Sequence, residues 1–321
     1  MRTLPSLRGF ALAAVLFLMT GCGGGSGGAS TGGGGTSLTG AGATWTPVTA
    51  PTGTSTWRSV AFGAGTWVAV GNGYRATSTN GTTWTSSAVP DVNYYAQNTV
   101  AFANGTFVIA SSLGVSTSAT ATSWSSQALG AAQNLVGLAY GNGTWVMADD
   151  RFLSSDVLSF YVSGSGASWT QAVTSIPYAQ PTSVAFGGGK FVTVGYGGLV
   201  ATSTNGTAWT SQSLGSASDL GLQAVTYANG TFVAVTNSGK AYHSTDGVTW
   251  AKATVTVNAL YGVAFGNGVF VAVGNAGAIF TSPDAVTWTR RAWTGPYAAF
   301  EDVAFGNARF VAAGDSFAVS Q

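Results

Sequence analysis

The acidic side chains are few, and they are the residues best suited to chemistry. Glu301 is the only glutamate, and the densest acidic cluster is "ADDRFLSSD", which holds Asp149, Asp150 and Asp156. Two carboxylates facing each other across a glycosidic bond can cleave it, one as acid and one as base or nucleophile. Asp149, Asp150 and Glu301 are therefore the candidates for a carbohydrate-active hydrolase or lyase. A solvated charged loop beside Arg151 explains the cluster equally simply, and we favour that interpretation.

Other catalytic groups are nearly absent. His243 is the only histidine and Cys22 the only cysteine. This excludes an internal disulfide and argues against a histidine metal site or a Ser-His triad. We therefore expect no catalytic residue, no metal and no cofactor. Only 7% of the residues are charged and the net charge is +1, so we expect no nucleic-acid partner.

Aromatic residues gather in a few variable segments between otherwise small residues. The segments are "PDVNYYAQN", "SIPYAQP", "VNALY" and "RRAWTGPYAAFED". Their aromatic residues are Tyr94, Tyr95, Tyr178, Tyr261, Trp293, Tyr297 and Phe300. Exposed aromatic rings on loops can stack against sugars or a protein surface. The alternative is that they pack these loops onto the body of the domain.

Seven copies of one pattern must position these residues. Typical copies are "VAFGAGTWVAVG" and "VAFGNGVFVAVG". The copies begin at Val60, Val100, Leu138, Val184, Val225, Val263 and Val303, so they are spaced 40, 38, 46, 41, 38 and 40 residues apart. A period near 40 with several short strands per unit predicts a β-propeller.

Each unit divides into four expected strands. An alternating strand such as "SVAFG" is followed by a turn, often Asn-Gly, which favours a hairpin. A second strand, a third strand and a fourth strand headed by Trp complete the unit. Five Asn-Gly-Thr triplets, at Asn80, Asn104, Asn142, Asn205 and Asn229, are all expected in hairpin turns where Asn has positive φ.

The seventh unit stops after its third strand, at Gln321. The missing fourth strand is supplied by "TGAGATWTPV" around Trp45 near the start of the chain. The sequence thus predicts an all-β, seven-bladed propeller over residues 39–321, with four strands per blade and the last blade completed by this N-terminal strand. Such closure removes exposed sheet edges.

The turn before each fourth-strand tryptophan carries a recurring pattern, strongest in "STDGVTW" (244–250) and "STNGTTW" (78–84). This pattern resembles the Asp-box, or BNR, repeat of sialidase-like propellers, and also propellers related to photosystem II assembly factors. The resemblance covers residues 45–321, although each copy is one residue shorter than the usual form. It implies the fold and little about activity. A sialidase-type site would also need an arginine triad, and the chain has no Arg-Ile-Pro motif.

A second set of candidate residues stands two positions before each repeat. Its members, expected around the axis of the ring, are Arg58, Asn98, Val136, Thr182, Gln223, Tyr261 and Glu301. Arg58 and Glu301 become neighbours once the ring closes, so we expect them to pair. The candidate binding residues are therefore Arg58, Tyr94, Tyr95, Asn98, Tyr178, Gln223, Tyr261, Trp293, Tyr297 and Glu301.

Residues 1–21 have the features of an export signal. Arg2 and Arg8 precede the apolar run "FALAAVLFLMT", which is too short to span a bilayer. The following "LMTGC" resembles the bacterial lipoprotein signal, which implies that Cys22 is lipidated. Residues 22–38 form a Gly/Ser-rich flexible linker. The absence of Asp after Cys22 favours the outer membrane; an ordinary signal peptide, giving a secreted protein, is the alternative.

Together these features predict an exported lipoprotein, periplasmic or surface-facing, that contacts the membrane through its lipid anchor only. Its propeller is expected to be a monomeric, non-catalytic module that binds an envelope protein or a glycan. The alternatives are a carbohydrate-active enzyme, either a glycoside hydrolase or a lyase on a sialidase-like fold, and a structural surface protein without a specific ligand.

Overall fold

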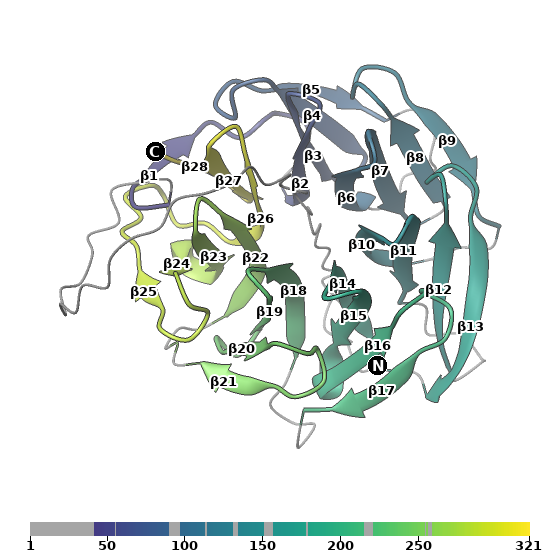
Figure 1. Ribbon diagram of the computed structural model, residues 1–321. Helices are drawn as coiled ribbons and strands as arrows, with labels where there is room; N and C mark the ends of the chain where they lie inside the picture. Colours follow the sequence, from purple (N-terminus) through teal and green to yellow (C-terminus); the bar gives the residue numbers. More distant parts are fainter. Residues whose placement is uncertain are drawn as a thin grey trace, which may run out of the picture.

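The protein is a ring of seven four-stranded antiparallel sheets (Figure 1). The computed structural model describes residues 42–54, 56–89, 97–112, 114–130, 134–150, 157–177, 179–214, 221–253, 255 and 259–321. Within them, regular structure is strand apart from two short 3-10 turns, η1 (Tyr196–Gly198) and η2 (Asn275–Gly277). The seven-bladed propeller predicted from the repeat is confirmed.

The first four blades follow the chain in order. Blade 1 contains β2 (Trp57–Gly63), β3 (Thr66–Gly71), β4 (Tyr74–Ser78) and β5 (Thr85–Ala88). Blade 2 contains β6 (Gln97–Ala103), β7 (Thr106–Ser111), β8 (Gly114–Ser118) and β9 (Ser125–Ala128). Blade 3 contains β10 (Leu135–Gly141), β11 (Thr144–Asp149), β12 (Val157–Ser163) and β13 (Thr170–Pro177). Blade 4 contains β14 (Pro181–Gly187), β15 (Lys190–Gly195), β16 (Leu199–Ser203) and β17 (Thr210–Ser213).

The last three blades complete the ring. Blade 5 contains β18 (Leu222–Ala228), β19 (Thr231–Thr236), β20 (Ala241–Ser244) and β21 (Ala251–Ala253). Blade 6 contains β22 (Leu260–Gly266), β23 (Val269–Gly274), β24 (Ile279–Ser282) and β25 (Thr289–Arg290). Blade 7 contains β26 (Phe300–Gly306), β27 (Arg309–Gly314), β28 (Phe317–Ser320) and β1 (Trp45–Val48).

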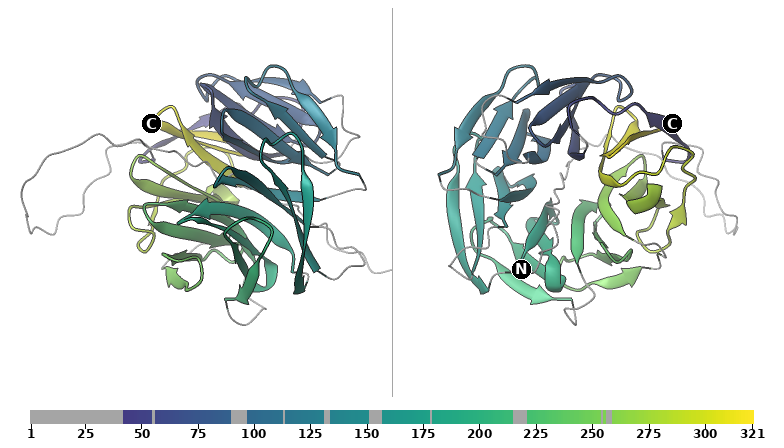
Figure 2. Two further views of the ribbon diagram at one scale, coloured as in Figure 1. Left: turned by 45° about the vertical axis from the view of Figure 1, so that its right-hand side comes forward. Right: turned by 180° about the vertical axis from the view of Figure 1, so that it is seen from behind.

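The strands give the ring two distinct ends. In each blade the first strand lies nearest the axis and the fourth at the periphery (Figures 1 and 2). We call the lower end the side that holds the turns between first and second strands, such as 64–65, and between third and fourth strands, such as 79–84. The upper end holds the loops between second and third strands, such as 72–73, and the start of each first strand.

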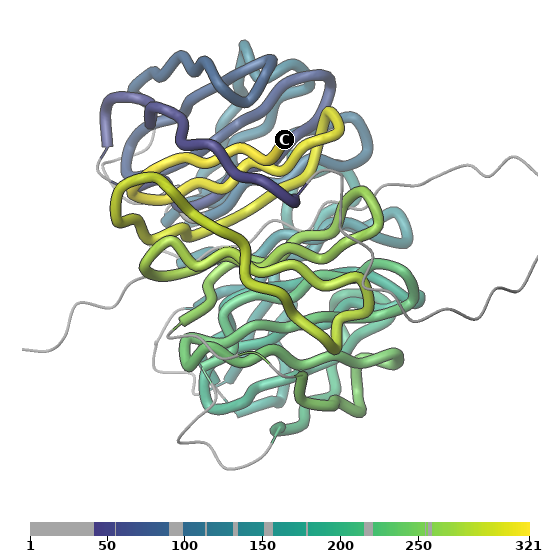
Figure 3. Tube along the Cα trace, turned by 90° about the vertical axis from the view of Figure 1, so that its left-hand side faces the viewer, coloured from purple at the N-terminus to yellow at the C-terminus, as the bar shows by residue number. Residues whose placement is uncertain are grey.

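Closure of the ring follows the prediction. β1 pairs antiparallel with β28, with Trp45 opposite Ser320 and Val48 opposite Phe317. Figure 3 shows this N-terminal segment lying beside the last strands of the chain. The Trp45 side chain is 5% exposed and its indole Nε1 donates to the carbonyl of Gly42 at 3.1 Å. The same indole-to-carbonyl bond spans three residues in each of the other six blades.

The turns between first and second strands place two residues in the left-handed region. Asn104 and Gly105 have φ values of 49° and 71°, and Asn267 and Gly268 have 47° and 79°. Positive φ at both central residues defines the type I′ turn, whose twist suits a hairpin. The expectation that all five Asn-Gly-Thr triplets adopt it is wrong at Asn80 and Asn205, which are not among the described residues with positive φ.

Those two asparagines belong to the turn between third and fourth strands, where the side chain caps the backbone. Asn80 Oδ1 accepts the amides of residues 82 and 83, both at 2.9 Å, and the Ser78 hydroxyl at 3.1 Å. Ser78 Oγ in turn accepts the amide of Gly81 at 2.9 Å. Asp246 makes the same set of bonds in blade 5. The side chain thus satisfies backbone donors locally, as Asx turns do.

Neighbouring blades interlock through aromatic rings laid over glycine. A Cβ added to Gly63 would come within 1.9 Å of the Phe102 ring in the next blade. The same close approach joins Gly141 to Phe186 and Gly306 to Phe62. The glycines that end most first strands therefore admit the aromatic residue of the following blade.

Candidate binding site at the upper end of the ring

Every first strand is interrupted near its upper end by a shift in register against its second strand. In each first strand one residue is skipped in the pairing, and it lies one position before the regular register resumes. These residues are Arg58, Asn98, Gly137, Thr182, Gln223, Tyr261 and Glu301. Six of them are the residues that the sequence placed two positions before each repeat; in blade 3, Gly137 takes the place expected for Val136. A β-bulge bends its strand and changes the direction of a side chain. The seven bulge residues, most of them polar, therefore form a ring at the upper end that does not follow the alternation of the strands.

Arg58 and Glu301 lie at adjoining first strands, β2 and β26. Arg58 Nε donates to Asn72 Oδ1 at 3.0 Å, and Glu301 is 8% exposed. Burial lowers the pKa of Arg58, while the charge of Glu301 acts in the opposite direction. The two side chains therefore interact electrostatically at the junction between the first and last blades.

Tyr196 and Gln223 face each other from blades 4 and 5. Burial is the largest influence on Tyr196 and raises its pKa, whereas a hydrogen bond with the Gln223 amide lowers it. The charges of Asp150 and Glu301 raise the same pKa further. The Tyr196 hydroxyl thus lies within electrostatic reach of acids from blades 3 and 7. We call Arg58, Asp150, Tyr196, Gln223 and Glu301 the axial cluster.

Gln223 is the most enclosed member of the axial cluster. It is 1% exposed, and its Nε2 donates to the carbonyl of Gly221 at 3.2 Å. Its Oε1 is buried and has no hydrogen-bond partner among the described residues. A buried acceptor without a donor is costly, and most such atoms in native proteins have a partner. A hydrogen-bond donor placed at the Gln223 carbonyl oxygen would therefore be favourable.

The acids of blade 3 are held by hydrogen bonds. Asp149 is 2% exposed and its Oδ2 accepts the Ser159 hydroxyl at 3.3 Å. Asp150 Oδ2 accepts the amide of Asn134 at 2.9 Å and that of Gln180 at 3.5 Å. Asp149 is directed into its own blade, so only Asp150 takes part in the axial cluster. Asp156, the third acid of this segment, lies outside the described residues.

The aromatic segment after blade 6 is partly packed and partly exposed. Trp293 lies over Gly277, stands edge-on to Phe300 with centroids 5.1 Å apart, and donates from Nε1 to the Pro296 carbonyl at 2.8 Å. Phe300, expected among the exposed rings, is wholly buried because it begins β26 with its side chain in the core. Tyr297 is 77% exposed, with its hydroxyl donating to Asn275 Oδ1 at 3.1 Å. Here the packing alternative holds for two of the three rings.

The remaining sequence candidates are spread unevenly. Tyr261 is the bulge residue of β22 and is half-buried. Tyr94, Tyr95 and Tyr178 lie outside the described residues, as does the side chain of Asn98. Cys22 and both segments before residue 39 lie outside them as well.

Sequence reasoning missed two upper-end residues. Tyr196 is the first residue of η1, "YGG"; the same 3-10 turn recurs in blade 6 as η2, where Asn275 stands in place of the tyrosine. Asp302 is fully buried at the start of β26 and accepts the Ser59 hydroxyl at 2.9 Å and the Val60 amide at 3.0 Å across the closure. Burial raises the pKa of Asp302 to about 8 against these hydrogen bonds. The signal for Asp302 was an acid in a repeat position that elsewhere holds Ser, Thr, Gly or Ala.

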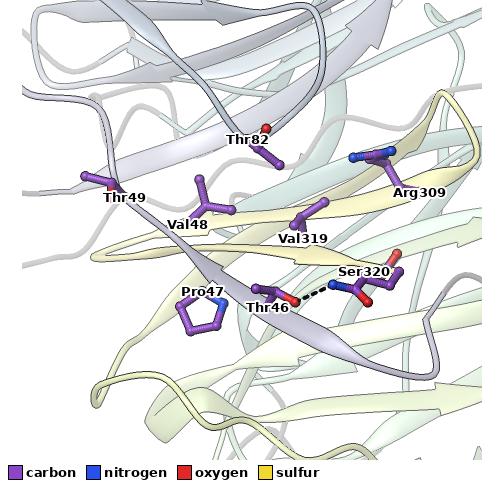
Figure 4. A pocket seen from close by; sticks show the side chains of 9 residues that line it. Thr46, Pro47, Val48, Thr49, Thr82, Arg309, Val319 and Ser320 are labelled. Carbon is purple, nitrogen blue, oxygen red and sulfur yellow. Dashed lines mark hydrogen bonds between the residues drawn. The ribbon is translucent and has the colours of Figure 1, made fainter.

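A separate groove lies at the periphery where β1 meets β28 (Figure 4). Thr46, Val48, Val319 and Arg309 line it, and Gln321 Nε2 donates to Thr46 Oγ1 at 3.0 Å. Arg309 is occupied in donating to the carbonyl of Asn80 at 3.2 Å. The groove belongs to the closure of the ring rather than to the axial cluster.

The described part of the chain contains no cluster of three or more His, Cys, Asp or Glu side chains that could hold a metal ion. In the same residues, no helix has the length and apolar character needed to cross a membrane.

Comparison with known proteins supports the propeller. The family model of the DUF6242 beta propeller domain matches residues 183–300. No curated protein matches the sequence significantly. Among solved structures, YCF48 bound to D1 peptide is 18% identical with a TM-score of 0.66, covering 86% of this chain and 96% of that one.

Two further structures show the same likeness. YCF48 from Cyanidioschyzon merolae is 16% identical with a TM-score of 0.65, covering 87% of this chain and 98% of its own. A catalytically inactive form of virginiamycin B lyase from Staphylococcus aureus with Quinupristin is 10% identical with a TM-score of 0.73, covering 86% and 98%. At such identities the likeness extends to the fold, and the chain is similar to propellers of different activity.

Proposed function

We propose that this protein is a non-catalytic module that binds an envelope protein or a glycan at the upper end of its propeller. The observation that carries the proposal is the ring of bulge residues at the upper end, which includes Arg58, Gln223 and Glu301. The pKa values of Arg58 and Tyr196 respond to other members of the axial cluster, across blades 1, 3, 4, 5 and 7. A small number of convergent polar groups is a common feature of ligand sites. The similarity to YCF48, whose solved complex contains a D1 peptide, supports a scaffold role.

The site extends outward from the axial cluster to the aromatic segments. Tyr297 offers an exposed ring, and Tyr261, Tyr94, Tyr95, Tyr178 and Asn98 are proposed as further contacts. Trp293 supports this surface, because its ring is packed on Gly277.

The anchoring proposal rests on sequence. Residues 1–21 act as a lipoprotein signal, Cys22 carries the lipid, and residues 22–38 tether a monomeric propeller at the outer membrane. The Ser–Asx turns of the lower end support the resemblance to Asp-box repeats, because their side chains cap the backbone. Labelling of cells with a radioactive fatty acid, with Cys22→Ser as control, tests the anchor.

Capture of partners from the native envelope tests the binding role. Full-length protein is cross-linked in cells, and captured proteins and glycans are compared between wild type and Glu301→Gln combined with Tyr297→Ala. Asp284→Asn, at the lower end, is the matched control. The proposal requires that capture fall with the upper variants and persist with the control. Capture that is equal in all three would contradict it and favour a structural surface protein.

A carbohydrate-active hydrolase or lyase is the second candidate. It is favoured by one observation: the charges of Asp150 and Glu301 both raise the pKa of the Tyr196 hydroxyl. Release of reducing sugar or unsaturated product from envelope glycans, abolished in both Asp150→Asn and Glu301→Gln, would replace the binding proposal with this one.

A further inference from the structure

The axial cluster has a definite polarity. Its charged members are two carboxylates, Asp150 and Glu301, and one guanidinium, Arg58, so it carries a net negative charge. Its neutral members present oxygen atoms: the Tyr196 hydroxyl and the Gln223 carbonyl. The excess of carboxylate over guanidinium charge therefore favours a cationic occupant over an anionic one.

The unpartnered Gln223 oxygen is independent of this charge balance. It is buried and receives no hydrogen bond from the part of the chain that the structure describes, although the Nε2 atom of the same amide donates to Gly221. An occupant that donates an N–H here would satisfy an acceptor that the protein itself leaves unsatisfied. An anionic occupant would leave that oxygen bare and would be repelled by both carboxylates.

We propose that the axial cluster recognises a cationic hydrogen-bond donor, the guanidinium or ammonium group of an arginine or lysine on a partner polypeptide. This deepens the proposed binding function and rests on it. Glu301 and Asp150 supply the charge complementarity, and Gln223 and Tyr196 accept hydrogen bonds from the same group. Arginine suits the site well because its planar group carries five donors.

Binding of short capped peptides to the full chain tests the proposal. The probes are acetyl-Gly-Arg-Gly-amide and the citrulline analogue, which has the same shape without the charge, measured by calorimetry at low salt. We expect the arginine peptide to bind and the citrulline peptide to bind at least about tenfold more weakly. Glu301→Gln should weaken the arginine peptide by a similar factor, whereas Asp246→Asn at the lower end should leave it unchanged.

Several outcomes would overturn the assignment. Equal binding of the two peptides, or preference for a Gly-Glu-Gly peptide, would exclude recognition of a cation. Displacement of the arginine peptide by millimolar Ca²⁺ would assign the cluster to a metal ion instead. Agmatine binding more tightly than the peptide would support the cation and overturn its polypeptide source.

Failure here can be separated from failure of the proposed function. If envelope capture depends on the upper-end variants while no arginine or lysine peptide binds, the binding module stands and its preference for a cation falls. Tyr196→Phe, which removes one acceptor and keeps the ring, is a second test variant in case Glu301→Gln does not fold. It should weaken the arginine peptide at an unchanged melting temperature.

Discussion

The lower and upper ends of this propeller are built from the same seven repeats, but they differ in how their polar groups are satisfied. At the lower end, turn after turn satisfies its own polar groups: Asp246 Oδ1 accepts the amide of Thr249 at 2.7 Å and that of Val248 at 2.8 Å. At the upper end, each blade has a different residue at its bulge, and among the described residues the Gln223 Oε1 atom has no hydrogen-bond donor.

The difference shows which positions of the repeat the fold constrains and which it does not. Glycines and Asn-Gly turns at the lower end recur because each blade needs the same hairpin and the same contact with its neighbour. No such requirement fixes the bulge residue, since it is outside the ladder. Variation at that position can therefore form a site without loss of the fold.

The largest loss of stability is expected from Trp45→Ala. This ring is 5% exposed and fixes β1 in the last blade, and truncation of a buried tryptophan costs about 3–5 kcal/mol. Denaturant unfolding should show the loss. Tyr297→Ala, at the exposed upper end, should change the unfolding free energy by less than about 0.5 kcal/mol. Similar losses of unfolding free energy in the two variants would contradict this difference between the buried closure strand and the exposed upper end.

The next effect concerns Asp302, whose pKa is raised to about 8 in the folded protein. The unfolded carboxyl titrates near about 4, so the folded state holds a proton that the unfolded state releases between these values. Stability from this group is full below about pH 4 and falls as pH rises to about 8, by at most about 1.4 kcal/mol per pH unit.

Asp302→Asn tests this by removing the titration while retaining an acceptor for Ser59 and Val60. Melting temperatures of wild type and variant should converge toward low pH and diverge in favour of the variant as the pH approaches the raised pKa. A wild-type curve parallel to that of the variant would show that Asp302 stays ionised in the folded protein.

How far the sequence predicts each end differs for physical reasons. The ring and its closure at Trp45 were predictable, because identical local requirements recur at a fixed period. The position of Arg58 and Glu301 was predictable for the same reason, since it is counted from the repeat. Tyr196 was not, because its turn recurs only in blade 6 and begins there with Asn275, so no repeat of the tyrosine marks the position. The burial of Phe300 was missed because one residue changes a loop position into a strand position.

A smaller, stabilising effect is expected at the one type I′ turn that lacks glycine. Ala308 has φ of 58°, where the other six blades place glycine. Left-handed backbone costs an L-residue about 1–2 kcal/mol, partly offset by the greater freedom of unfolded glycine. Ala308→Gly should therefore raise the unfolding free energy by about 0.5–1 kcal/mol. Gly268→Ala is the reverse control; if it also stabilises, the turn geometry is misassigned.

The smallest effect is expected at the exposed turn acid Asp246. Hydrogen bonds from the Thr249 and Val248 amides lower its pKa to about 2. Its stabilisation is present above about pH 4 and is lost as pH falls through about 2. Asp246→Asn should flatten this part of the melting curve without harming the turn, because Asn80 and Asn205 fill the same position. A collapse of stability at neutral pH would show that the charge itself is required.

The direction of β1 has a consequence for how the molecule would be held. The strand runs from the lower end upward, since Gly42 packs beside Phe310 at the lower end and Val48 pairs with Phe317. Any attachment through the residues before Gly42 therefore pulls on the lower side of the ring. In such an attachment the axial cluster lies at the opposite end of the ring from the point of attachment.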